Sequence, residues 1–211
     1  MITVHHLADS RSQRILWLLE ELEIPYEIQH YPRIEQKFAD PKLKELHPLG
    51  KSPIISDGDR VVVESAAIIE YILELYGNGR LRPPTGSDDW VRYLQWMHLI
   101  EGSVMPPLLI AIYLEILGPP SEPLHPRIFG EVTLYLQHLA DELKDRDFIV
   151  GNSLTGADIM VNFLLEGAWL YKRIEAWPHL KDYVKRMQAR PAYQRALEKG
   201  GNYNLGRLHA N

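Results

Sequence analysis

The apolar and polar positions in the first part of the chain alternate between strand-like and helix-like patterns. Short apolar runs rich in β-branched and aromatic residues predict strands at residues 2–6 and 26–31. Between them, residues 12–23 carry leucine and isoleucine at helical spacing, and Asp40-Pro41 suits the start of a further short helix. The order strand, helix, strand, helix predicts an α/β domain.

Two more strands and a helix complete this domain. The apolar pairs and triplets at residues 54–55 and 61–63 flank a turn-rich segment and predict a hairpin. Ser65 is expected to cap a helix that runs to Tyr76 and ends at Gly77. The glycines and prolines that follow predict a linker. We therefore expect a first domain at residues 1–78 and a linker at residues 79–87.

Only helical patterns follow the linker, so the second domain, residues 88–211, is expected to be entirely α-helical. The motif Thr155-Gly156-Ala157-Asp158 resembles a capping box in which Asp158 takes the place of the usual Glu or Gln. The expected helices cover residues 88 to about 117, 126–144, 155–173, 177–188 and 191–199.

Composition and charge remove several classes of protein. With 211 residues, 45% hydrophobic and 24% charged, the chain fits two globular domains. The net charge of −5 is spread out and there is no Lys/Arg block, so no nucleic-acid partner is expected.

The absence of cysteine excludes disulfides, thiolate nucleophiles and zinc–thiolate sites. The nine histidines lack metal-binding spacing, and His5 and His6, adjacent on a strand, point to opposite faces, so no metal is expected.

The chain shows no signal-peptide pattern after Met1. Its longest apolar run, residues 105–117, contains Pro106, Pro107 and Glu115 and is too short to cross a bilayer. We therefore expect a cytoplasmic protein without a membrane partner.

Ser10 is the first candidate for chemistry. It lies where the first helix begins, near unpaired backbone N–H groups and the positive end of the helix dipole, which favour an anion. Ser10-Arg11-Ser12-Gln13 also matches a capping box, which would give Ser10 a purely structural role.

Two further motifs follow. Ser52-Pro53 lies between a loop and a strand; a cis bond there would leave the Ser52 backbone free to pair with an extended peptide, although an ordinary edge-strand proline has the same sequence. Glu64-Ser65 at a helix start suits an amino-acid head group, because Ser65 can donate to a carboxylate and Glu64 can accept from an ammonium. Any helix start also prefers these residue types.

These motifs together resemble the cytosolic glutathione transferases, most of all their serine-type bacterial and fungal branch. The resemblance implies a thioredoxin-like N-terminal domain that binds glutathione and an all-helical C-terminal domain that supplies the second-substrate pocket. It covers nearly the whole chain and is carried by the runs at residues 6–22, 47–53, 64–68, 155–158, 177–180 and 190–193.

The resemblance also implies roles for individual residues. Ser10 would donate a hydrogen bond to the glutathione sulfur, with Ser12 as an alternative donor. Ser52, before a cis Pro53, would pair through its backbone with the cysteinyl unit. A serine hydroxyl is too weak a base to deprotonate a thiol, so donation to the thiolate is expected, not proton abstraction.

The remaining implied contacts belong to the two ends of glutathione and to the second substrate. Glu64 and Ser65 would hold the γ-glutamyl head. Lys51 would lie near the glycyl carboxylate or its neighbouring backbone.

A stripe on the long helix after the linker is the candidate wall of a pocket for a hydrophobic electrophile, although most such stripes are core. It consists of Met97, Glu101, Met105, Leu109 and Tyr113.

The expected activity is conjugation of glutathione to this electrophile by a homodimer, with no cofactor besides glutathione. A glutathione-dependent peroxidase, a non-enzymatic scaffold, and a lactone- or isomer-processing enzyme are the alternatives.

Overall fold

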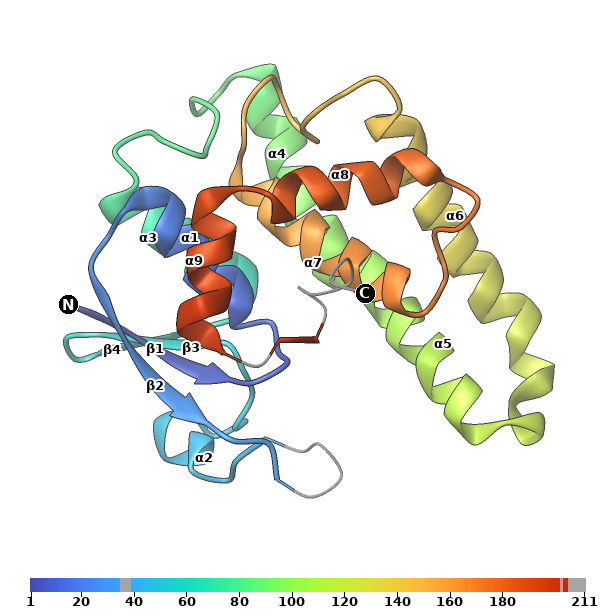
Figure 1. Cartoon of the computed structure of the whole chain (residues 1–211), viewed down its shortest axis with the longest axis horizontal. Helices are drawn as coiled ribbons and strands as arrows, with labels where there is room; N and C mark the ends of the chain where they lie inside the picture. Colours follow the sequence, from blue (N-terminus) through green and yellow to red (C-terminus); the bar gives the residue numbers. More distant parts are fainter. Residues whose placement is uncertain (35–38, 202, 205–211) are drawn as a thin grey trace. The chain divides into compact units, whose positions relative to one another are not determined.

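A computed structural model of the chain describes residues 1–34, 39–201 and 203–204 (Figure 1). The chain divides into two compact units, one formed by residues 1–82 together with 187–211 and the other by residues 83–186. Each unit is described by itself.

A four-stranded mixed sheet is the centre of the first unit (Figure 1). The strands are β1 (Ile2–Leu7), β2 (Tyr26–Tyr31), β3 (Ile54–Asp57) and β4 (Arg60–Val63), in the order β2-β1-β3-β4. β1 pairs in parallel with β2 and antiparallel with β3, and β3 and β4 form the predicted hairpin. The parallel pair requires a crossover, which the first helix supplies.

The helices of the first unit are α1 (Gln13–Leu22), α2 (Leu43–Leu46), α3 (Ser65–Tyr76) and α9 (Pro191–Gly200). Helix α1 packs against both α3 and α9, which explains why nearly all its side chains are buried. On the sheet, Leu43 of α2 packs with Leu7 and Ile54. This thioredoxin-like arrangement confirms the predicted fold class of the N-terminal domain.

The last helix, α9, packs with the first unit. The sequence pattern instead assigned it, with the rest of residues 88–211, to the helical domain. Arg190 forms a two-pronged ion pair with Glu21, at 2.6 and 2.9 Å. Arg195 donates to Glu20 at 2.8 Å and Lys199 also donates to Glu20. These contacts, up to 179 positions apart in the chain, attach α9 to α1.

Replacement of Glu20 by glutamine is expected to destabilise the protein by about 1–2 kcal/mol at neutral pH. Burial raises the pKa of Glu20, but hydrogen bonds from Lys199, Tyr26 and Arg195 outweigh it and hold the pKa below its usual 4.5. A lowered pKa means that the stabilisation is present above about pH 4.5 and is lost as the pH falls through the folded-state value.

Urea unfolding of both proteins between pH 3 and pH 7 tests this expectation. The difference in unfolding free energy should shrink as the solution becomes acidic. A difference that stays constant across that range would show that the carboxylate charge of Glu20 does not contribute.

The second unit is helical, as predicted. Its helices end within a few residues of the expected positions, and a short 3₁₀ segment, Pro119–Leu124, was not predicted. They are α4 (Asp88–Leu99), α5 (Met105–Leu117), α6 (His125–Leu143), α7 (Gly156–Leu170) and most of α8 (Pro178–Gln188).

A π-helical turn, Ile100–Val104, joins α4 to α5 in one continuous helix. The N–H of Met105 donates to the carbonyl of Ile100, five residues back. Pro106 and Pro107 follow at once and have no N–H to donate, so the usual hydrogen-bond ladder is interrupted here. The whole helix, residues 88–117, is apolar and long enough to cross a membrane, with a mean hydropathy of 1.6 in its most apolar window. Length and composition alone are weak grounds for a membrane span, since core helices share them.

Helix α7 lies in the core of the second unit, where most of its side chains are buried. Asp158 caps it: Oδ2 accepts from the backbone N–H and the hydroxyl of Thr155, at 2.8 and 2.9 Å. Oδ1 accepts from the N–H of Ile149 and the hydroxyl of Tyr183, both at 2.8 Å. The predicted capping box is therefore confirmed, and Asp158 has a structural role.

Candidate active site

The register of the sheet brings the sequence motifs to one edge of the first unit. His5 of β1 pairs with Ile54 of β3, and Ile54 pairs with Val63 of β4. The segments that follow β1, precede β3 and follow β4 therefore meet at the same end of the sheet. These segments carry Ser10, Ser52-Pro53 and Glu64-Ser65, so the three predicted motifs of this domain lie at the same end of the sheet.

Ser10 and Ser12 occupy different positions in this site. The Ser10 hydroxyl lies 3.0 Å from the Ser52 hydroxyl, which joins the first motif to the second. Ser10 retains 7% of its surface exposed, whereas Ser12 is fully buried. The Ser12 hydroxyl contacts His6, Ser10 and the backbone of Leu7, all within 3.2 Å. Of the two candidate sulfur donors, Ser10 is the one with accessible surface.

The capping box predicted for Ser10 and Gln13 does not form. The Ser10 hydroxyl accepts from the N–H of Ser12, two residues on, at 3.1 Å. The Gln13 side chain is buried and makes no hydrogen bond to any residue that the structure describes. Helix α1 begins later than predicted, at Gln13, because residues 10–12 form tight turns closed by bonds between residues three apart. Ser10 therefore does not act as the helix cap that the structural interpretation required.

Two side chains from distant parts of the chain fix the loop that carries Ser10. Arg33 donates to the carbonyls of Ala8 and Asp9, at 2.8 and 2.5 Å. Asn204 donates to the Asp9 carboxylate through its backbone and its side chain, at 2.7 and 2.8 Å. Burial lowers the pKa of the Arg33 guanidinium, and Asp9 opposes this. Sequence reasoning missed both anchors, since neither belongs to a local motif.

The peptide bond between Ser52 and Pro53 is cis. Pro53 is buried where β3 begins, while Ser52 is half-buried and Lys51 is exposed. A cis X-Pro bond is a minority state even before proline, so its presence distinguishes this turn from an ordinary edge-strand proline.

Glu64 and Ser65 follow β4 directly. Glu64 is exposed and has a φ of 71°, a left-handed conformation that non-glycine residues rarely adopt and that concentrates at functional sites. Ser65 is the first residue of α3 and not the cap that the sequence predicted; Glu64 occupies the capping position. The Ser65 hydroxyl is buried, at 3% exposure, and has no hydrogen-bond partner among the described residues. A buried hydroxyl at a helix start without a protein partner suits an anionic ligand.

The stripe predicted for the electrophile pocket begins at Met97 on α4 and Glu101 in the π turn and continues on α5, where its residues lie in different environments. Met105 is buried, Leu109 is half-buried and Tyr113 is 63% exposed. The π turn precedes Met105, so the stripe read from the sequence does not continue unchanged from α4 into α5.

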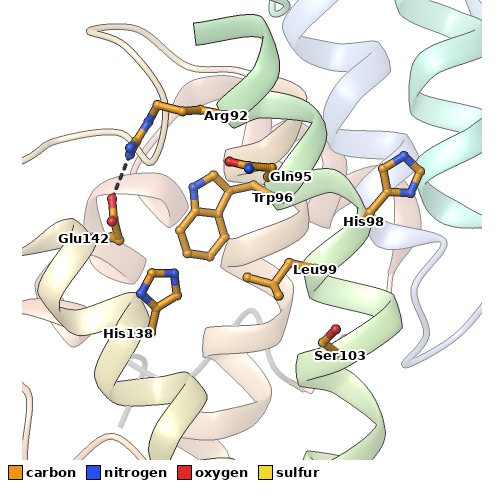
Figure 2. Close-up of a pocket in the computed structure, with 8 residues that line it drawn as sticks. All are labelled: Arg92, Gln95, Trp96, His98, Leu99, Ser103, His138 and Glu142. Carbon is orange, nitrogen blue, oxygen red and sulfur yellow. Dashed lines mark hydrogen bonds and ion pairs between the residues drawn. The ribbon is translucent and has the colours of Figure 1, made fainter. Parts of the chain in front are cut away.

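The second unit also contains a pocket of about 490 Å³ between α4 and α6, shown in Figure 2. Trp96 stacks on His138 with ring centres 5.3 Å apart, and Arg92 pairs with Glu142 at 2.7 Å. None of the residues predicted for a site lines this pocket. Throughout the part of the chain that the structure describes, no cluster of three or more histidine or acidic side chains could hold a metal ion.

Comparison with known proteins gives a consistent assignment. Residues 10–75 match the model of the glutathione S-transferase N-terminal domain, and residues 100–191 match that of the C-terminal domain. Glutathione S-transferase 3 of Schizosaccharomyces pombe is 33% identical, over 94% of this chain and 88% of its own length. Glutathione S-transferase 1 of Saccharomyces cerevisiae is 30% identical, over 94% of this chain and 95% of its own.

A solved structure agrees with these sequences. The crystal structure of a glutathione S-transferase from Actinobacillus pleuropneumoniae has a TM-score of 0.88 and 36% identity, over 99% of this chain and 97% of its own. A thioredoxin-like sheet domain followed by a helical unit, together with these matches, defines the class as glutathione-using transferases. The chain belongs to the glutathione transferase family. It is an enzyme that binds glutathione and conjugates it to a second substrate.

Proposed function

We propose that Ser10 donates a hydrogen bond to the sulfur of bound glutathione and stabilises it as the thiolate. The observation that carries this proposal is the Ser10 hydroxyl, which retains accessible surface and lies 3.0 Å from the Ser52 hydroxyl, at the end of the sheet where the other motif residues lie. A free thiol has a pKa of about 8.5 and only its thiolate is strongly nucleophilic. Each unit by which the site lowers that pKa corresponds to about 1.4 kcal/mol of thiolate stabilisation.

The rest of the glutathione molecule is held by the neighbouring motifs. The backbone of Ser52, beside the cis bond, pairs with the cysteinyl unit as an added strand would. Glu64 accepts from the ammonium of the γ-glutamyl head and Ser65 donates to its carboxylate. Exposed Lys51 lies near the glycyl carboxylate. In support, the Ser65 hydroxyl is buried yet unpaired in the described part of the chain.

Replacement of Ser65 by alanine is expected to raise the KM for glutathione by about 10- to 100-fold, because a hydrogen bond to a charged group contributes about 1.5–3 kcal/mol. The melting temperature should not fall, since the Ser65 hydroxyl has no partner among the described residues. Steady-state kinetics with varied glutathione and thermal unfolding without ligand measure the two effects.

A matched control is Ser56→Ala, which removes a hydroxyl bonded to His5 in the same sheet. It should leave the KM for glutathione unchanged. A Ser65→Ala protein with an unaltered KM would show that Ser65 does not hold the γ-glutamyl carboxylate.

The second substrate is a hydrophobic electrophile that contacts α5 through Leu109 and Tyr113. Both retain exposed surface, whereas Met105 is buried and contributes through packing. Ile110, Ile116 and Leu117 of the same helix are also exposed. Such apolar surface suits a hydrophobic ligand.

Parallel assays with a chlorinated aromatic compound and an organic hydroperoxide test the activity. Conjugation should exceed peroxide reduction. A protein that reduces the hydroperoxide but leaves the chloroarene unchanged is a glutathione peroxidase. One that neither is retained on immobilised glutathione nor shows a thermal shift with millimolar glutathione is a scaffold.

The enzyme belongs to the serine-type bacterial and fungal branch, acts as a cytoplasmic homodimer and needs no cofactor besides glutathione. Residues 1–78 form the glutathione-binding domain and 79–87 the linker, and the helical domain begins at residue 88, with its last helix, α9, packed against the first unit. The assignment to the serine-type branch is supported by the presence of Ser10. Light scattering of the purified protein tests the oligomeric state, and a monomeric mass would contradict the homodimer.

A further inference from the structure

A line of hydrogen-bonded side chains leads from Ser10 into the interior of the first unit. The Ser10 hydroxyl lies 2.8 Å from the Ser12 hydroxyl, which lies 2.9 Å from Nδ1 of His6. Ser12 and His6 are both buried. Neither has exposed surface through which to contact glutathione, and Ser10 is the side chain that links them to the proposed site.

The hydroxyl of Ser12 has more neighbours than it can bond at once, which limits the directions of its hydrogen bonds. A hydroxyl donates once and accepts at two lone pairs. The N–H of Leu7 fills one lone pair of the Ser12 oxygen, at 3.2 Å. One lone pair and one proton of Ser12 remain for three partners: His6 at 2.9 Å, Ser10 at 2.8 Å and the Leu7 carbonyl at 3.2 Å. The Leu7 carbonyl is the most distant of the three. If His6 donates to Ser12, then Ser12 donates to Ser10, its shorter contact. If His6 accepts from Ser12, then Ser12 can only accept from Ser10.

The surroundings of His6 favour the first arrangement. Burial and the neighbouring His30 lower the pKa of His6 to about 4, against a smaller opposing effect of the Gly200 backbone. The ring is therefore neutral at pH 7 and carries one proton. Nε2 is buried, makes no well-aligned hydrogen bond within the described residues, and has only the Gly200 backbone beside it. A proton on Nε2 would have only the weak contact with the Gly200 backbone, the smallest of the effects on the His6 pKa, whereas a proton on Nδ1 has the Ser12 oxygen at 2.9 Å to receive it.

We propose that His6 and Ser12 are positioning residues that orient the proton of Ser10. His6 donates from Nδ1 to Ser12, Ser12 donates to Ser10, and the proton of Ser10 is left for the glutathione sulfur. This inference rests on the proposed function, in which Ser10 is the sulfur donor.

This direction determines the roles of Ser10 in its own contacts. Its two lone pairs are filled by the N–H and the hydroxyl of Ser12. The contact with the Ser52 hydroxyl must then be a donation from Ser10. The Ser10 proton thus points toward the second motif, where the cysteinyl unit of glutathione is proposed to bind. With no free lone pair, Ser10 can act as a donor but not as a base.

The tautomer of His6 is the most direct observable. ¹⁵N NMR of the histidine-labelled protein at pH 7 distinguishes a ring protonated at Nδ1 from one protonated at Nε2, and the His6 signal is assigned by its loss in His6→Asn. We expect the Nδ1–H form both without ligand and with S-methylglutathione bound. The Nε2–H form would overturn the proposal.

The thiol pKa of bound glutathione, followed by thiolate absorbance, tests the functional effect. Ser12→Ala and His6→Leu should each raise it by about one unit, a tenfold change in the ionisation constant, with little change in the KM for glutathione. His6→Asn places an amide donor near the position of Nδ1 and should restore at least half of the shift. A packing defect would not be repaired in this way.

Matched controls come from the same strand. His5→Leu and Ser56→Ala disrupt a second histidine–serine pair, joined at 2.8 Å, that is not linked to Ser10, and should leave the thiol pKa unchanged. The Ser10→Ala variant separates the two hypotheses. If it raises the thiol pKa while Ser12→Ala and His6→Leu do not, the positioning role is wrong and the donor role stands. If Ser10→Ala has no effect, the donor role itself is wrong. Should His6→Leu fail to fold, Ser12→Ala and the tautomer decide.

Discussion

Replacement of Ser10 by alanine should raise the thiol pKa of bound glutathione by about 1–2 units. A hydrogen bond to a charged group contributes about 1.5–3 kcal/mol, and each pKa unit corresponds to about 1.4 kcal/mol. Below the thiol pKa, the thiolate fraction falls tenfold for each unit. The rate of conjugation at pH 6.5 should therefore fall by about 10- to 100-fold. Thiolate absorbance in the binary complex and kcat for a chlorinated aromatic substrate measure the two effects.

The loss should be confined to the chemical step. Ser10 contacts Ser12 and Ser52, and its proposed contact with glutathione is with the sulfur alone, so the KM for glutathione should change little. Ser10→Thr keeps a hydroxyl at this position and should recover part of the rate. A Ser10→Ala enzyme with normal activity and an unshifted thiol pKa would remove Ser10 from the mechanism.

The second large effect concerns stability. Asp158→Ala is expected to lower the free energy of unfolding by about 3–5 kcal/mol. The carboxylate is fully buried and accepts four hydrogen bonds, from the backbone of Ile149, the backbone and hydroxyl of Thr155, and the hydroxyl of Tyr183. Burial raises the pKa of Asp158 and these hydrogen bonds oppose the rise. Alanine would leave two buried backbone N–H groups without an acceptor, and each such loss is costly. Chemical denaturation monitored by circular dichroism gives the difference.

Asp182→Ala serves as the comparison, because Asp182 lies in α8 and makes an exposed ion pair with Lys185. Exposed pairs contribute about 0–1 kcal/mol, so this variant should unfold almost like the parent protein. Equal stabilities of the Asp158 and Asp182 variants would contradict the structural role of Asp158.

The elements of the fold were predictable where the apolar pattern is local and strongly periodic. The strands of the sheet and helices such as α1 and α7 follow directly from spacing and caps. The π turn at Ile100–Val104 was not predicted, because two prolines inside an otherwise regular helical pattern allow several local solutions. The packing of α9 on α1 depends on ion pairs between residues 20 and 199, and similar distant pairs, which no local pattern contains.

The candidate site also combines residues that local motifs predict with contacts that they do not. Ser10, Ser52-Pro53 and Glu64-Ser65 were found from local motifs, and the sheet register brings them together. The capping box assigned to Ser10 was wrong because a turn with Ser12 satisfies the hydroxyl instead. The link from Ser12 to His6 could not be predicted, because it depends on the rotamers of buried side chains.

The structure of a complex with an S-alkyl glutathione tests the central claim most directly. We expect the sulfur within hydrogen-bond distance of the Ser10 hydroxyl, the cysteinyl backbone paired with Ser52, and the γ-glutamyl carboxylate bound to Ser65. A ligand whose sulfur lies away from Ser10, with its γ-glutamyl head bound elsewhere than at Glu64 and Ser65, would contradict it.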